Sequence, residues 1–131
     1  MNEIVKEWVF KSEGDFRTAT REFLVTEFPN YDAVCYHSEH CIEKLMKALL
    51  IKSEVSFDYT HNLIKLQEYL QAVNPSLTFE VNDLKFLTRA GLNFRYPGEN
   101  AEKEEAMTSL ELTKMIREKL ISYIGQEYFI A

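Results

Sequence analysis

The stretch from Ala33 to Ile51 constrains the fold of this chain more than any other segment. Projected as a helix at about 100° per residue, it carries one apolar stripe about 100° wide, the usual width of a core-facing helix surface. The stripe consists of Val34, Cys41, Leu45, Ala48 and Leu49. A helix of this length with one apolar stripe predicts a helical bundle, in which each helix buries one face against its neighbours.

Beside the apolar stripe, the same predicted helix carries a basic edge. Four residues fall within a sector of about 80°, and they are His37, His40, Lys44 and Lys47. Glu39 and Glu43 project to the other polar side and are expected to form an acidic edge. A helix that only packs needs no cluster of this kind, so we expect the basic edge to carry a function.

Apolar residues at spacings of three and four predict five helices in all, counting the one above. The expected helices cover residues 3–28, 32–52, about 60–73, about 82–91 and about 100–124. Pro29 ends the first of them, Thr60 is the expected N-cap of the third, and Gly14 is expected to allow close approach of a neighbour. We predict an all-α, antiparallel bundle, an up-and-down four-helix bundle with one short added helix, in a single domain spanning residues 1–131.

Composition limits the function classes. The 131 residues carry a net charge of −6, which argues against broad binding of duplex nucleic acid, although a local basic groove stays open. No apolar run approaches the roughly 20 residues that span a bilayer, and the acidic N-terminus is unlike a signal peptide. We therefore predict a cytoplasmic protein without membrane contact. Cys35 and Cys41 would lie about 9 Å apart along one helix, too far for a disulfide, and Cys41 projects into the core.

Three patterns occur in a fixed order along the chain. The central helix carries His37, Glu43, Lys44, Lys47 and Ala48. Next comes Thr60-His61-Asn62-Leu63, and then the turn Arg95-Tyr96-Pro97. In this order the patterns resemble the HEPN family (higher eukaryotes and prokaryotes nucleotide-binding domains), with Trp8 and Asp15 also at positions such proteins often use. The resemblance covers about residues 8–123.

The resemblance implies a helical bundle that pairs as a two-fold homodimer and works with a minimal nucleotidyltransferase. Some members resemble ribonuclease toxins of toxin–antitoxin systems, with that partner as antitoxin. Others are noncatalytic modules that bind nucleotides or scaffold the partner. The apolar chain end, with Tyr123, Tyr128, Phe129 and Ile130, is expected to pack on a second subunit.

In the ribonuclease branch, an arginine is followed by a histidine, with about four to six residues between them. The matching positions after Arg95 are Asn100, Ala101 and Glu102, and no histidine follows His61. Metal-free RNA cleavage needs a group that moves a proton near neutral pH. The sequence therefore favours a noncatalytic module. A ribonuclease that uses His37 or His61 as a displaced base, and a pure protein-interaction scaffold, stay open as alternatives.

The candidate binding residues come from all three patterns, and they are Arg95, Tyr96, His37, Lys44, Lys47 and His61. Arginine and lysine would bind phosphate of a nucleotide or RNA, and the tyrosine would stack on a base. The structural alternatives are a turn tied to an acid by Arg95, a solvated edge with a Glu43–Lys47 pair, and a capping His61. No cofactor and no metal are expected, because Glu43 projects about 120° from His37 and leaves the pair of His37 and His40 short of ligands.

Overall fold

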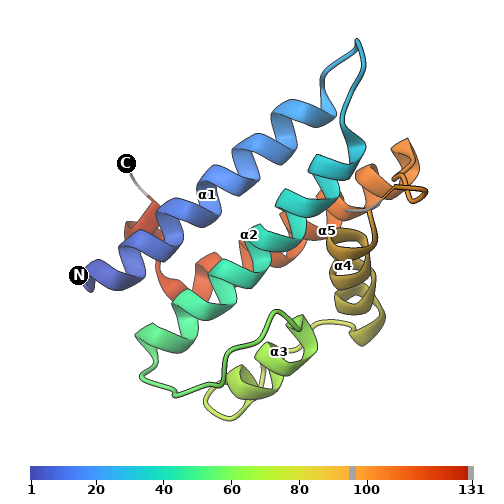
Figure 1. Cartoon of the computed structure of the whole chain (residues 1–131). Coiled ribbons are helices and arrows are strands. Elements are labelled where there is room, and N and C mark those ends of the chain that lie inside the picture. Colours follow the sequence, from blue (N-terminus) through green and yellow to red (C-terminus); the bar gives the residue numbers. More distant parts are fainter. Residues whose placement is uncertain (95–96, 130–131) are drawn as a thin grey trace.

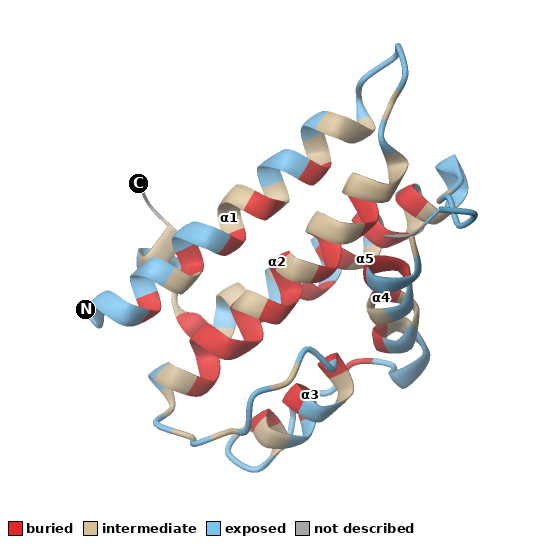
Figure 2. Ribbon diagram, in the orientation of Figure 1, coloured by how far each residue is buried: buried red, intermediate tan, exposed pale blue. Residues whose placement is uncertain are grey.

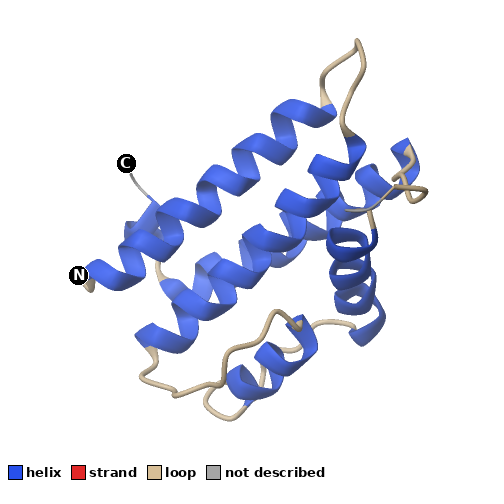
Figure 3. Cartoon of the chain, in the orientation of Figure 1, coloured by secondary structure: helices blue, strands red, loops and turns tan. Residues whose placement is uncertain are grey.

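The computed structural model describes residues 1–94 and 97–129, and within these ranges it contains helices and no strand (Figure 3). The elements are α1 (Glu3–Phe23), α2 (Tyr31–Lys52), α3 (Leu63–Gln71), α4 (Val81–Asn93), α5 (Lys103–Ile124) and the short 3₁₀ helix η1 (Gln126–Phe129). The prediction of an all-α chain with five helices is confirmed. No helix in the described ranges is both long enough and apolar enough to cross a membrane.

Helix α2 lies at the centre of the bundle. It runs antiparallel to α1, its neighbour in the chain, and α3, α4 and α5 contact its other sides (Figure 1). Buried residues line the helix faces that point toward one another, whereas the outer faces are exposed (Figure 2). The predicted apolar stripe of α2 is confirmed, since each of its residues is at most 2% exposed, and these are Val34, Cys41, Leu45, Ala48 and Leu49.

The Cys41 thiol illustrates how closed this core is. Cys41 is fully buried, and burial raises the pKa of its thiol to about 12. Both Cys35 and Cys41 are free, so the expectation that they form no disulfide with each other is confirmed. At neutral pH a buried, protonated thiol is a small apolar side chain rather than a nucleophile.

Two helix ends differ from the sequence prediction. Helix α1 ends at Phe23, five residues before the predicted end, and the exposed Phe28 that would have closed it has a positive φ of 52°, outside the helical region. Helix α3 is capped by Asn62, not Thr60: the Asn62 side chain accepts hydrogen bonds from the backbone N–H groups of Ile64 and Lys65. The Thr60 hydroxyl instead accepts a hydrogen bond from the backbone N–H of Asn62, just before the helix begins.

The chain end packs on its own bundle. Tyr123, Tyr128 and Phe129 lie against the main hydrophobic core. The Tyr128 hydroxyl accepts a hydrogen bond from the backbone N–H of Asn2 (3.2 Å), which joins the two ends of the chain. These three residues therefore have an intramolecular role that the sequence prediction of a subunit contact did not foresee; Ile130 lies outside the described residues.

Two glycines inside helices have opposite surroundings. A Cβ atom added to Gly91 of α4 would lie 2.7 Å from the Cβ of Glu39, whereas one added to Gly14 of α1 would meet nothing within 4 Å. The close approach therefore occurs at Gly91, and the expectation for Gly14 is wrong. The absence of a side chain at Gly91 is what lets α4 lie directly on Glu39.

We expect Gly91→Ala to destabilise the fold by about 1–3 kcal/mol, because α4 or Glu39 has to move to make room for the methyl group. Gly14→Ala is the matched control and should stabilise the fold by about 0.5–1 kcal/mol, because alanine favours the helix and meets no neighbour. Urea denaturation followed by circular dichroism measures both. A stability loss in Gly14→Ala equal to that in Gly91→Ala would contradict the assigned packing.

Candidate functional site

The carboxylate of Asp15 joins two residues of the predicted basic edge. His37 Nδ1 lies 2.7 Å from Asp15 Oδ1, and Lys44 Nζ donates to Asp15 Oδ2 at 2.6 Å. Asp15 belongs to α1, and both basic residues belong to α2. The antiparallel pairing of the two helices therefore brings together groups that are 22 and 29 residues apart in the chain.

The Asp15 carboxylate is stable in its charged form despite being only 9% exposed. Burial raises its pKa, but the hydrogen bonds from His37 and Lys44 and their charges lower it by more, so the pKa lies below the ordinary value of 3.8. Asp15 is therefore ionised at neutral pH. It fixes the position of one ammonium and one imidazole at the surface between α1 and α2.

The second group of charges is centred on Glu43, in the interior. Lys47 Nζ donates to Glu43 Oε2 at 3.1 Å, and His61 Nδ1 lies 2.8 Å from Glu43 Oε1. The other ring nitrogen of His61 lies 2.6 Å from the Tyr59 hydroxyl. The Lys47 ammonium also lies 5.8 Å from the ring centre of Trp8 and 5.3 Å from that of Tyr59. This group connects α2 to the segment that precedes α3.

The predicted acidic edge on α2 is wrong. Glu39 and Glu43 are only 4% and 3% exposed, and Lys47, expected on the basic edge, is only 4% exposed. The physical reason is that four helices surround α2, so most of its sides face protein rather than solvent. The Glu43–Lys47 pair of the structural alternative is present, but both residues are buried, so the solvated edge that this alternative expected is wrong.

The third group consists of Glu39 and His40. His40 Nδ1 lies 2.8 Å from Glu39 Oε2 and 2.8 Å from the carbonyl oxygen of Tyr36. Burial raises the pKa of Glu39, and the hydrogen bond with His40 lowers it by less, so the net shift is upward. For His40, burial lowers the pKa, but the hydrogen bonds with Glu39 and Tyr36 and the nearby carboxylates raise it by more in sum. Both groups thus hold a proton more readily than they would in water.

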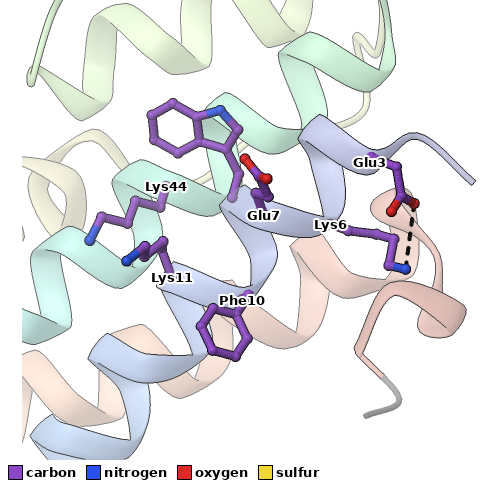
Figure 4. A pocket seen from close by; sticks show the side chains of 7 residues that line it. Glu3, Lys6, Glu7, Phe10, Lys11 and Lys44 are labelled. Carbon is purple, nitrogen blue, oxygen red and sulfur yellow. Dashed lines mark ion pairs between the residues drawn. The ribbon is translucent and has the colours of Figure 1, made fainter.

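An open pocket of about 810 Å³ is lined by the first part of α1 and by Lys44 of α2. Its lining includes Trp8, Phe10 and Lys11 of α1 as well as Lys44. Figure 4 shows Lys11 and Lys44 extending from the two helices toward the same side of the pocket, away from the ion pair of Glu3 and Lys6 at the other end. Within the described part of the chain Lys11 forms no ion pair. The lining as a whole carries three ammonium groups, two aromatic rings and two carboxylates, the latter from Glu3 and Glu7.

A second, smaller hollow of about 340 Å³ is lined in part by His37. His37 and Tyr36 line it from α2, and Gly91 and Phe94 line it from the end of α4. The predicted residues Arg95 and Tyr96 follow Phe94 directly in the chain and lie outside the described residues.

Three contributors to this region were not among the residues predicted for binding, namely Trp8, Lys11 and Asp15. On a helix, residues at these spacings fall within about 60° of one another, so they share one face of α1. A polar and aromatic face on the first helix is the signal that could have identified them. The partner they would face on α2 could not be read from spacing.

The fold and these polar groups are those of a helical-bundle domain with a charged central helix, and comparison with known proteins identifies its family. The model of the HEPN domain family matches residues 5–123, and the chain therefore belongs to the HEPN family. Among solved structures, TT1696 from Thermus thermophilus has a similar fold, with a TM-score of 0.72 at 18% identity over 94% of this chain and 99% of that one. Among curated proteins, none matches this chain.

We expect Asp15→Asn to lower the free energy of unfolding at pH 7 by about 1–3 kcal/mol, because charged hydrogen bonds to His37 and Lys44 are lost. The folded pKa of Asp15 is depressed, so its stabilisation is complete above its unfolded value near 3.8 and falls away as pH drops toward the folded value. Urea denaturation at pH 7 and between pH 5 and 3 measures the free energy of unfolding of both proteins. The difference between wild type and variant should become smaller as the pH falls. A difference that stays constant with pH would show that the charge of Asp15 does not contribute to stability.

Proposed function

We propose that this chain is a noncatalytic HEPN module that binds the phosphate of a nucleotide or of RNA and pairs with a minimal nucleotidyltransferase. The observation that carries the proposal is the pocket in which Lys11 and Lys44, from two helices, meet beside Trp8. Two ammonium groups attract a phosphate, and an aromatic ring offers a surface on which a base can stack.

The contacts of Lys44 suit it to this role. An ammonium has three donors, and Lys44 gives one of them to Asp15, which leaves two for a ligand. Asp15 also holds the side chain in place, so less conformational entropy is lost when a phosphate binds. Lys11 adds a second charge without a competing ion pair in the described part of the chain.

Lys47 and His61 support the site from behind rather than at its surface. Lys47 is buried and lies over the Trp8 ring, so in this proposal it positions the aromatic surface. His61 holds Glu43, which in turn holds Lys47. The proposal therefore assigns both residues a positioning role.

We also assign Arg95 and Tyr96 to this ligand, because they follow Phe94, which lines the second hollow. Phe94, their neighbour in the chain, shares that hollow with His37, and His37 shares Asp15 with Lys44. The fork of donors on an arginine suits a phosphate group, and a tyrosine ring suits stacking on a base.

The proposed partners are a second copy of this chain and the nucleotidyltransferase, both in the cytoplasm. Support comes from large apolar side chains that are at least 57% exposed, such as Ile4, Phe10, Leu24 and Phe28. The proposal takes these side chains as contact points, because contact with a second protein would remove their apolar surface from water.

A ribonuclease is the second candidate, and His61 is the observation that favours it. One ring nitrogen of His61 lies against the buried carboxylate of Glu43 and the other against the exposed hydroxyl of Tyr59. A carboxylate that orients an imidazole is how many enzymes prepare a general base.

Nucleotide binding is tested through Trp8, the only tryptophan of the chain. We expect adenosine diphosphate and a short single-stranded RNA to change its fluorescence in a saturable way. Lys11→Ala and Lys44→Ala should each weaken binding by about tenfold, the equivalent of about 1.4 kcal/mol for one charged contact. Arg95→Ala should also weaken it.

The matched control is Lys119→Ala, which removes one exposed lysine of α5 outside the pocket and should change affinity by less than about twofold. Circular dichroism checks that every variant is folded. Equal affinities for Lys44→Ala and wild type would remove the pocket from the site.

Wild-type protein incubated with a mixed RNA pool should leave the RNA intact. A comparison with His61→Gln under the same conditions separates the two candidate functions. Cleavage by wild type that is lost in His61→Gln would replace the noncatalytic proposal with the ribonuclease.

A further inference from the structure

One turn of α2 brings three potential metal-binding side chains around a common point, and none of the three lines the pocket proposed for phosphate. One carboxylate oxygen of Glu39, one of Glu43 and one ring nitrogen of His40 all lie within 4.8 Å of one another. Ligand atoms bound to one zinc ion at about 2.0–2.2 Å are at most about 4.4 Å apart. Small side-chain rotations would therefore bring all three atoms to bonding distance from one ion.

The surroundings of these atoms favour a cation. Glu39 and Glu43 are nearly fully buried. Lys47 and His61 already compensate Glu43, whereas Glu39 is paired with His40, so a bound cation would supply positive charge beside Glu39 when His40 acts as a neutral ligand. His40 is partly exposed, with 13% of its side chain accessible, which gives an ion a route from solvent. Gly91 brings the backbone of α4 close to Glu39: a Cβ atom added there would lie 3.2 Å from Glu39 Oε2.

A second layer of contacts holds the potential ligands in place. His61 Nδ1 lies 2.8 Å from Glu43 Oε1, and Lys47 donates to Glu43 Oε2. Each carboxylate oxygen has two lone pairs, so these bonds leave one on each oxygen for a metal. Hydrogen-bonded carboxylates are the usual arrangement around protein metal ions.

We propose that Glu39, His40 and Glu43 form a binding site for one divalent first-row transition metal ion, such as Zn²⁺, with water completing its coordination. The imidazole ligand selects this class over Mg²⁺ and Ca²⁺, which take oxygen ligands. This set differs from the pair of His37 and His40 considered in the sequence, because His37 is held by Asp15. Through Glu43 and His61, the ion would stiffen the link between α2 and the segment before α3.

The test is titration of the full-length, chelator-treated protein with Co²⁺, followed by its visible absorption, and with Zn²⁺, followed by calorimetry. We expect one ion per chain and a rise in melting temperature on saturation. Glu39→Gln and His40→Gln should each weaken binding at least about tenfold. Two ligand variants are used so that a folded one is available if the other does not fold.

His37→Gln and Glu118→Gln are the controls. The first removes the other histidine of α2, and the second removes an exposed carboxylate of α5. Loss of binding in the two ligand variants but not in the two controls would establish the site. Absence of saturable binding to wild type, or binding that depends on His37 rather than on Glu39 and His40, would overturn the proposal.

Discussion

The enclosure of α2 by four other helices is the constraint on which the rest of this structure depends. It buries Glu39, Glu43 and Lys47 together with the apolar stripe, and a buried charge is tolerated only when it is paired. Glu43 meets this requirement by holding Lys47 on one oxygen and His61 on the other. The position of the segment before α3, and of the rings around Lys47, follows from that pairing.

The same enclosure divides the basic residues of α2 into a buried set, which stabilises the fold, and a surface set, which stays accessible to a ligand. Lys47 turns inward, where its charge is used by Glu43 and two aromatic rings. Lys44 and His37 stay at the surface between α1 and α2, anchored by Asp15 but still accessible. A surface set of this kind can serve a ligand without destabilising the bundle, because the charges that the fold needs are satisfied separately.

Much of the fold could be predicted, and the residues show why. The apolar stripe of α2 and the pairing of Glu43 with Lys47 depend on spacings of three and four within one helix, and such spacings can be read directly. The role of Asp15 could not be read, since its partners are 22 and 29 residues away. Asn62 rather than Thr60 caps α3 because the turn geometry, not residue preference alone, decides which side chain reaches the free N–H groups.

The sequence by itself determined the helices, the apolar side of the central one and the family to which the chain belongs, because these follow from local periodicity and short ordered patterns. Tertiary structure decided which polar residues are buried and which meet. It turned the expected acidic edge into buried ion pairs, placed Lys11 beside Lys44, and directed the chain end onto its own core. The reason is physical: burial and contact between helices depend on how the helices surround one another, and residue spacing along one helix carries no information about that.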